Sequence, residues 1–281
     1  MNVVVKDAKR IFLKKGTCSQ TLCFLLDREF GHLKPNEERA ADPLAGGLLQ
    51  GGHQCGMLWG ATLAVGADSF RRHADRDQAI GAAMAATRHL VGSFEKRAGS
   101  VNCRDILGCD FTSKSGLLKA LFLGRFIRCF RLAGQWAPEA IQAATTGLAL
   151  APAGLPEHSL SCASEVVRLM GGSDEEMVMV AGFAGGIGLS GNGCGALGAA
   201  VWMTVLGLLR TNNWKYSLSD PVTKGIIKKF HEAAGSEMEC HKITGRRFKT
   251  ISEHTEFIKS GGCDTLIQLL ARSQAAATES N

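Results

Sequence analysis

The sequence contains a single tyrosine and six prolines among its 281 residues, and aromatic side chains make up only 6% of the chain. No segment shows the sustained alternation of apolar and polar residues that a half-buried β-strand requires. Glycine is abundant, with 34 residues, and apolar residues recur at helical spacing, for example over residues 79–94. This composition argues against a β-rich fold and predicts an all-α protein whose helices approach one another closely.

Signals for export and for membrane insertion are also lacking. Residues 1–15 carry several charges and show no uncharged core followed by a cleavage site, so we expect no secretory signal. The longest uncharged run, residues 177–209, is interrupted by glycine-rich sequence, so we expect a buried helix–loop–helix rather than a transmembrane span. We therefore expect a cytoplasmic protein, in which ten cysteines favour metal binding or redox chemistry over structural disulfides.

Several classes of function find no support in the sequence. The net charge is +6, but no basic motif is interleaved with aromatic residues, so we expect no nucleic-acid binding. The positive charge suits an acidic redox partner protein instead. No catalytic Ser/His/Asp set or carboxylate pair is recognisable, and the Cys-x-x-Cys pairs of zinc ribbons and ferredoxins are absent. The sequence does not indicate an oligomeric state.

The main positive signal is an internal repeat. Residues 45–56 (AGGLLQGGHQCG) align without gaps with residues 184–195 (AGGIGLSGNGCG), and residues 94–103 resemble residues 230–240. The segment 149–158 contains two prolines and is predicted to be the linker between the copies. We therefore expect two tandem helical modules related by internal duplication, over residues 1–148 and 159–281.

Each module keeps four cysteines in the same order. They are Cys18, Cys55, Cys103 and Cys129 in the first module, and Cys162, Cys194, Cys240 and Cys263 in the second. Four ordered cysteines shared by two halves that have otherwise diverged indicate a common role in cofactor binding. Cys23 and Cys109 have no counterpart in the second module, and we interpret them as incidental buried thiols.

Most of the repeated cysteines are predicted to lie at helix starts. Cys55 and Cys194 each stand between a glycine-rich loop and an apolar run, where unpaired amides and the helix dipole favour a thiolate. Cys129 is an exception, since it lies inside the basic amphipathic segment 114–136. The second module keeps the full setting, and its four cysteines, Cys162, Cys194, Cys240 and Cys263, are the predicted metal ligands.

The order Cys162, Gly193-Cys194-Gly195-Ala196, Cys240, Cys263 resembles the redox-active protein family named C_GCAxxG_C_C after its motif. The first module resembles a diverged copy in which Gln54 and Met57 replace the glycine and alanine beside the cysteine. The resemblance implies a helical, redox-active protein. A related module in some multihaem cytochromes is associated with an iron–sulfur centre, which the resemblance makes a candidate cofactor here.

Three hypotheses for the function follow. The first is a protein that binds an iron–sulfur cluster, or another metal, through cysteine thiolates and serves in electron transfer or redox sensing. The second is a thiol/disulfide redox protein without metal, and the third is a helical interaction protein whose cysteines merely pack. His53 and His241 adjoin repeated cysteines but are not shared between the copies, so we interpret them as local polar contacts.

Overall fold

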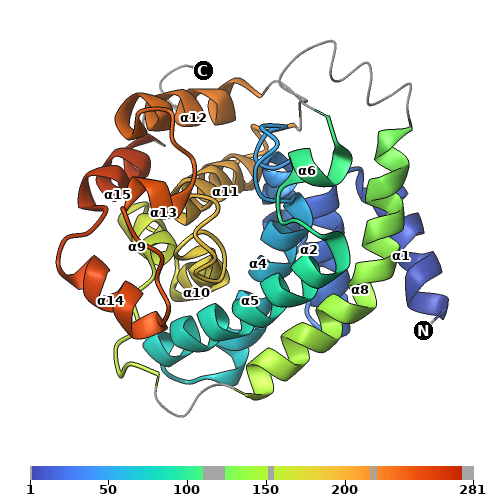
Figure 1. Ribbon diagram of the computed structural model, residues 1–281, viewed down its shortest axis with the longest axis horizontal. Coiled ribbons are helices and arrows are strands. Elements are labelled where there is room, and N and C mark those ends of the chain that lie inside the picture. Colours follow the sequence, from blue (N-terminus) through green and yellow to red (C-terminus); the bar gives the residue numbers. More distant parts are fainter. Residues whose placement is uncertain (1, 110–123, 151–154, 216, 218–219, 274–281) are drawn as a thin grey trace.

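The computed structural model describes residues 2–109, 124–150, 155–215, 217 and 220–273. Within these ranges the chain is helical and contains no β-strand (Figure 1), so the predicted all-α class is confirmed. The predicted amphipathic segment 114–136 and the predicted linker 149–158 lie partly outside the described residues. In the described part of the chain, no helix is long and apolar enough to cross a membrane.

The first half of the chain, blue to green in Figure 1, forms seven described α-helices and one 3-10 helix. These are α1 (Asn2–Lys15), α2 (Cys18–Glu29), α3 (Pro35–Ala40), η1 (Asp42–Leu44), α4 (Gly56–Arg72), α5 (Arg76–Ala98), α6 (Cys103–Leu107) and α8 (Arg125–Ala149). The second half forms α9 (Cys162–Leu169), α10 (Asp174–Met179), η2 (Ala181–Phe183), α11 (Gly195–Arg210), α12 (Pro221–Ala234), α13 (Cys240–Ile243), α14 (Ile251–Lys259) and α15 (Asp264–Ala271).

Local sequence signals set the starts of several helices. Ser173 and Glu176 form a reciprocal capping box at the start of α10. Asp220 caps α12, where Pro221 occupies the first helical position. The hydroxyls of Thr17 and Ser161 cap α2 and α9 in the same way, so that the cysteine after each cap is the first residue of a helix. Local sequence therefore determines where these four helices begin.

The two halves pack against each other through reciprocal contacts. Helix α4 of the first half packs on α10 and η2 of the second, while its counterpart α11 packs on α3 and η1. Such reciprocity is the pattern of a symmetric dimer. The indole of Trp59 meets the ring of Phe183 edge-on at 4.6 Å, and Trp202 Nε1 donates to the Glu37 carbonyl at 3.0 Å. One hydrophobic core therefore runs through both halves.

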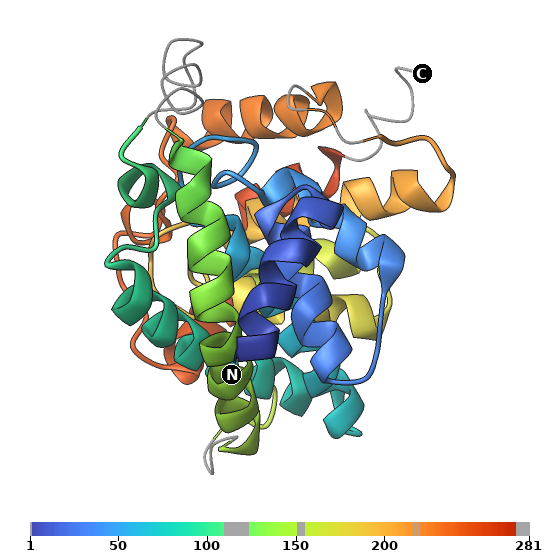
Figure 2. The ribbon, with the colours of Figure 1, turned by 90° about the vertical axis from the view of Figure 1, so that its right-hand side faces the viewer.

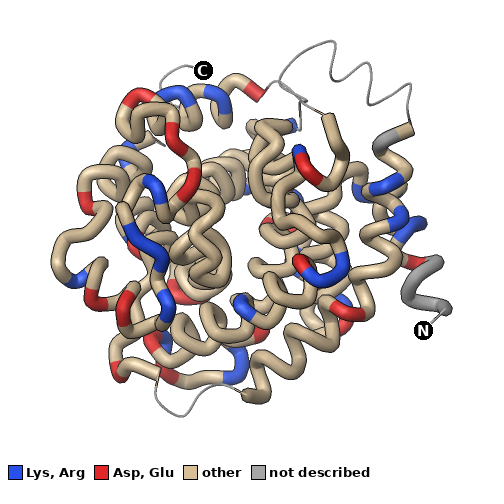
Figure 3. The backbone as a smooth tube through the Cα atoms, viewed as in Figure 1, with Lys and Arg blue, Asp and Glu red and all other residues tan. Residues whose placement is uncertain are grey.

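Charged residues lie mainly on the outer helices (Figure 3). The central helices α4 and α11 carry charges only near their C-terminal ends, and most of their residues are buried. Figure 2 shows α1, α2 and α8 together on the outer side of the first half, where α8 packs along α1 and α5. The first cysteines of both modules, Cys18 and Cys162, are buried within the fold.

Alanine substitution of two helical glycines tests the packing between the halves. A Cβ at Gly66 in α4 would lie 2.4 Å from the Val178 carbonyl oxygen and 2.5 Å from Met179 Cα. We expect Gly66→Ala to lower the free energy of unfolding by about 1–3 kcal/mol, measured by urea denaturation. The control is Gly225→Ala in α12, where a Cβ meets nothing within 4 Å, and which we expect to be stabilising by about 0.5–1 kcal/mol. Equal midpoints for both variants would contradict the close packing of α4 on α10.

A candidate thiol redox site

The glycine-rich loop of each module is a left-handed turn. Five consecutive residues, 46–50 in the first module and 185–189 in the second, all have positive φ. Leu48 and Ile187 lie at equivalent positions, with φ of 66° and 59°, although this region costs an L-residue about 1–2 kcal/mol. Both copies therefore keep the same backbone strain, which the surrounding packing must hold, and strain of this kind is concentrated at functional sites.

The first glycine of each turn binds the first cysteine of its module. The amide of Gly46 donates to Cys18 Sγ, and the amide of Gly185 donates to Cys162 Sγ. The backbone amides at the start of each helix also act to lower the pKa of the sulfur. Amide donors of this kind stabilise the thiolate form.

The glycine after the second cysteine permits the close approach of these elements. A Cβ at Gly56 would lie 2.6 Å from Cys18 Sγ and 2.8 Å from Ala45 Cα. At Gly195 it would lie 2.0 Å from the Phe183 carbonyl oxygen. The glycine of the repeated Cys-Gly pair is therefore required in both modules. In the first module a side chain there would collide with Cys18, and in the second it would collide with the end of η2.

The structure brings the four repeated cysteines of each module together. In the first quartet, Cys18 and Cys55 form a side-chain hydrogen bond, and Cys103 and Cys129 interact electrostatically with Cys18. The second quartet consists of Cys162, Cys194, Cys240 and Cys263, which also interact electrostatically with one another. All the cysteines are free thiols in the structure.

The hydrogen bond in the first quartet separates the acidities of its two thiols. It lowers the pKa of Cys18 below the ordinary value of 9.0, although burial acts in the opposite direction. The same hydrogen bond, together with burial, raises the pKa of Cys55 well above that value. Burial also raises the pKa of Cys129 to about 12. Cys55 therefore holds the proton of the pair, and Cys18 is the thiol that ionises first.

The second quartet has a different electrostatic character. Burial raises the pKa of Cys162, although its amide donors act to lower it. Burial also raises the pKa of Cys194 and of Cys263 to about 12, and it raises the pKa of Cys240. All four thiols are therefore neutral near pH 7.

The two unrepeated cysteines differ in their surroundings. Cys23 is fully buried and donates to Asp27 Oδ2 at 3.5 Å, which fits the interpretation as an incidental thiol. Cys109 instead lies beside the first quartet, because it interacts electrostatically with Cys103 and Cys129. The sequence comparison missed this residue because its place in the second module is held by an arginine.

Gln54, one of the departures from the family motif, crosses to the other module. Its Nε2 donates to the Gly186 carbonyl at 2.7 Å and to Ser190 Oγ at 3.1 Å. Its Oε1 occupies space that a Cβ at Gly193 would need, and Gly193 is the counterpart of Gln54 in the repeat. Since Cys55 follows Gln54 and Gly193 precedes Cys194, the two quartets lie on either side of this contact.

The described residues contain no group of three or more His, Cys, Asp or Glu side chains placed to hold a metal ion. Four thiols with amide donors are chemically suited to a soft metal, but in their present positions they do not form a coordination group. His241 is held by the Gly191 carbonyl, which accepts from Nδ1 at 2.9 Å, as expected of a local polar contact. The metal role of the second quartet stays a prediction.

Comparison with known families identifies the repeated module. A family model described as "Putative redox-active protein (C_GCAxxG_C_C)" matches residues 17–139 and again residues 159–276. The chain belongs to the C_GCAxxG_C_C family. It carries the family module twice, so that the predicted resemblance and the two-part organisation of the fold are confirmed. No curated protein and no solved structure shows detectable similarity to the chain.

The titration of Cys18 tests the hydrogen bond with Cys55. In the native protein we expect one thiolate to form below pH 9.0, followed by ultraviolet absorbance, because the Cys55 thiol stabilises the Cys18 thiolate. In Cys55→Ala the main cause of the low pKa is removed while burial remains, so this titration should move above pH 9.0. Cys23→Ala is the control and should leave it in place. An unchanged curve in Cys55→Ala would contradict the pairing.

Removal of the Gln54 side chain tests the contact between the modules. Gln54→Ala deletes the bonds to Gly186 and Ser190 inside a buried interface, and we expect a loss of about 1–3 kcal/mol in unfolding free energy. The matched change Gln142→Ala, on the exposed face of α8, should stay within about 0.5 kcal/mol of the native protein. Chemical denaturation measures the unfolding free energy of both variants. Equal values would show that the Gln54 contact does not stabilise the protein.

Proposed function

We propose that the protein is a thiol–disulfide redox protein whose working pair is Cys18 and Cys55. Two observations support this proposal. The Cys55 thiol lowers the pKa of Cys18, and the backbone beside Cys55 approaches Cys18 so closely that a Cβ at Gly56 would lie 2.6 Å from its Sγ. A thiolate is the nucleophile of disulfide exchange, and a second thiol in contact with it completes the reaction. Cys18 is therefore the attacking thiol and Cys55 the resolving one.

An oxidised partner protein supplies the disulfide that exchanges with Cys18 and Cys55. The Cys18 thiolate attacks one sulfur of the partner, which breaks the partner disulfide and releases its other sulfur as a thiolate. Cys55 then passes its proton to that thiolate and attacks Cys18 Sγ, which releases the remaining partner sulfur as a thiolate. The Cys18 thiolate and the Cys55 thiol of this chain become a disulfide, and the partner takes up two electrons and one proton.

Burial determines how such a partner can reach the pair. Cys18 and Cys55 are both buried, whereas Cys109 and Cys129 are half-buried. In this proposal the partner approaches Cys18 from the side of the half-buried Cys109 and Cys129. The net charge of +6 favours a partner with an acidic surface.

An iron–sulfur cluster, or another thiolate-bound metal, at the second quartet is the second candidate. It is favoured by the backbone amides around Cys162 Sγ, among them those of Gly185, Ala163 and Ala196, which act to lower its pKa, because amide donors to sulfur tune such clusters. A bound metal would also supply the positive charge that lets thiols with raised pKa values ionise. This candidate uses Cys162, Cys194, Cys240 and Cys263 as ligands.

One preparation tests both candidates. The chain is purified without oxygen, assayed for iron and acid-labile sulfide, and then oxidised with glutathione disulfide before peptide mapping by mass spectrometry. We expect a disulfide between Cys18 and Cys55 that is lost in Cys55→Ser and retained in the control Cys23→Ser. Iron and sulfide that disappear in Cys194→Ser but persist in Cys55→Ser would establish the second candidate.

Two results would count against these proposals. If Cys18 and Cys55 remain reduced while other thiols of the native chain form disulfides, the working pair is wrongly assigned. If the protein contains neither metal nor an oxidisable thiol pair, the cysteines merely pack, as in the interaction-protein hypothesis. Circular dichroism of each variant separates a chemical effect from a failure to fold.

A further inference from the structure

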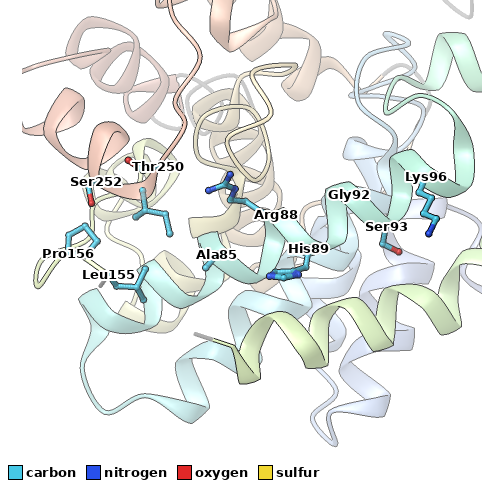
Figure 4. Close-up of a pocket in the computed structure, with 11 residues that line it drawn as sticks. Ala85, Arg88, His89, Gly92, Ser93, Lys96, Leu155, Pro156, Thr250 and Ser252 are labelled. Atoms are coloured by element: carbon cyan, nitrogen blue, oxygen red, sulfur yellow. The ribbon is translucent and has the colours of Figure 1, made fainter. Parts of the chain in front are cut away.

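A cavity of about 850 Å³ lies between α5 of the first half and the start of α14 in the second (Figure 4). Leu155 and Pro156, which precede α9, line one end of it. The volume falls within the range of about 300–1,000 Å³ found for small-molecule sites. The cysteine quartets do not line this cavity, and its chemistry is independent of theirs.

One face of α5 forms the floor of the cavity. Its residues follow helical spacing and are Ala85, Arg88, His89, Gly92, Ser93 and Lys96. Gly92 leaves the middle of this face open, because a Cβ there would meet nothing within 4 Å. The floor is therefore a shallow channel with cationic side chains on either side of its centre.

These cations are not neutralised within the described residues. The charged groups of Arg88 and Lys96 form no ion pair or hydrogen bond with any described side chain, and no Asp or Glu lines the cavity. By contrast, the neighbouring Arg97 points to α8 and pairs with Glu139. The unpaired positive charge in the cavity favours an anionic ligand.

The opposite wall adds further donors. Thr250, Ile251 and Ser252 line the cavity where α14 begins, and the Thr250 hydroxyl accepts from the Glu253 amide at 3.1 Å. The amides of Ile251 and Ser252 have no acceptor inside the helix, as is general for a first turn. A helix N-terminus adds partial positive charge and is a known binding place for phosphate.

The spacing of the donors sets the shape of the ligand. Arg88 and Lys96 are eight residues apart on one helix, a rise of about 12 Å. Figure 4 shows their side chains extending to opposite sides of α5, so that one phosphate does not contact both. Figure 4 shows Arg88 near the middle of the channel, between Lys96 at one end and Ser252 beyond it on the other side. The ligand therefore needs two anionic groups joined by a body that lies over Gly92.

We propose that this cavity binds a small organic molecule with a phosphate group at each end. One phosphate binds Arg88 and the first turn of α14. The other binds Lys96 and Ser93, whose Oγ accepts from Trp136 Nε1 at 3.2 Å and keeps its own proton free to donate.

Isothermal titration with two matched probes tests the proposal. Hexanediol bisphosphate has two phosphates on an apolar chain, and hexyl phosphate has one. We expect the bisphosphate to bind at least about tenfold more tightly to the full chain, because it gains a second set of charge-assisted hydrogen bonds. Lys96→Gln should abolish this advantage, and Arg88→Gln should weaken both probes by about tenfold.

Two further variants separate the cavity from general charge effects. Lys229→Gln removes one exposed, unpaired charge from α12, outside the cavity, and should leave both affinities unchanged. Gly92→Met fills the channel without altering charge and should block the bisphosphate, with thermal unfolding as the check on folding. Equal binding of the two probes, or equal weakening by Lys229→Gln, would overturn the proposal. Tight binding of hexaglutamate in place of the bisphosphate would overturn it in favour of an acidic peptide site.

Discussion

The hydrogen bond from a loop amide to a cysteine sulfur is the interaction on which both modules depend. Gly46 donates to Cys18, and Gly185 donates to Cys162. This bond fixes the left-handed turn against the start of the first cysteine-bearing helix, and the Cys-Gly pair at the end of the loop closes over it. The same bond tunes the sulfur, because an N–H donor stabilises the thiolate. Fold and chemistry therefore rest on one contact in each half.

Similar left-handed turns nevertheless give the two quartets different thiol chemistry. Both turns have the same run of positive φ, and both first cysteines receive the loop amide. Only the pKa of Cys18 is lowered, because the Cys55 thiol donates to it, whereas burial raises that of Cys162. The sequence favoured the second module for its intact motif, yet the more acidic thiol lies in the first. Motif integrity and thiol acidity are thus separate properties in this protein.

Much of the fold could be predicted because its signals are local. The repeat, the helix starts after Thr17 and Ser173 and the glycine-rich turns were all visible in short stretches of sequence. The proximity of Cys129 to Cys18, and that of Cys109 to Cys129, could not be predicted from the sequence. Both depend on how α8 packs over the module. The residues that Gln54 contacts are more than a hundred residues away in the sequence, and no local sequence pattern predicts such a contact.

Two positions of the repeat meet their own counterparts across the contact between the halves. Gln54 occupies the space beside Gly193, and the ring of Trp59 occupies the space that a Cβ at Gly198 would need. In a dimer of identical chains, a residue on the symmetry axis faces a copy of itself, so two indoles would collide or two glycines would leave a void. Joining the copies in one chain removes that restriction and makes their association independent of protein concentration. Duplication thus allowed a large residue on one side to be matched by a glycine on the other.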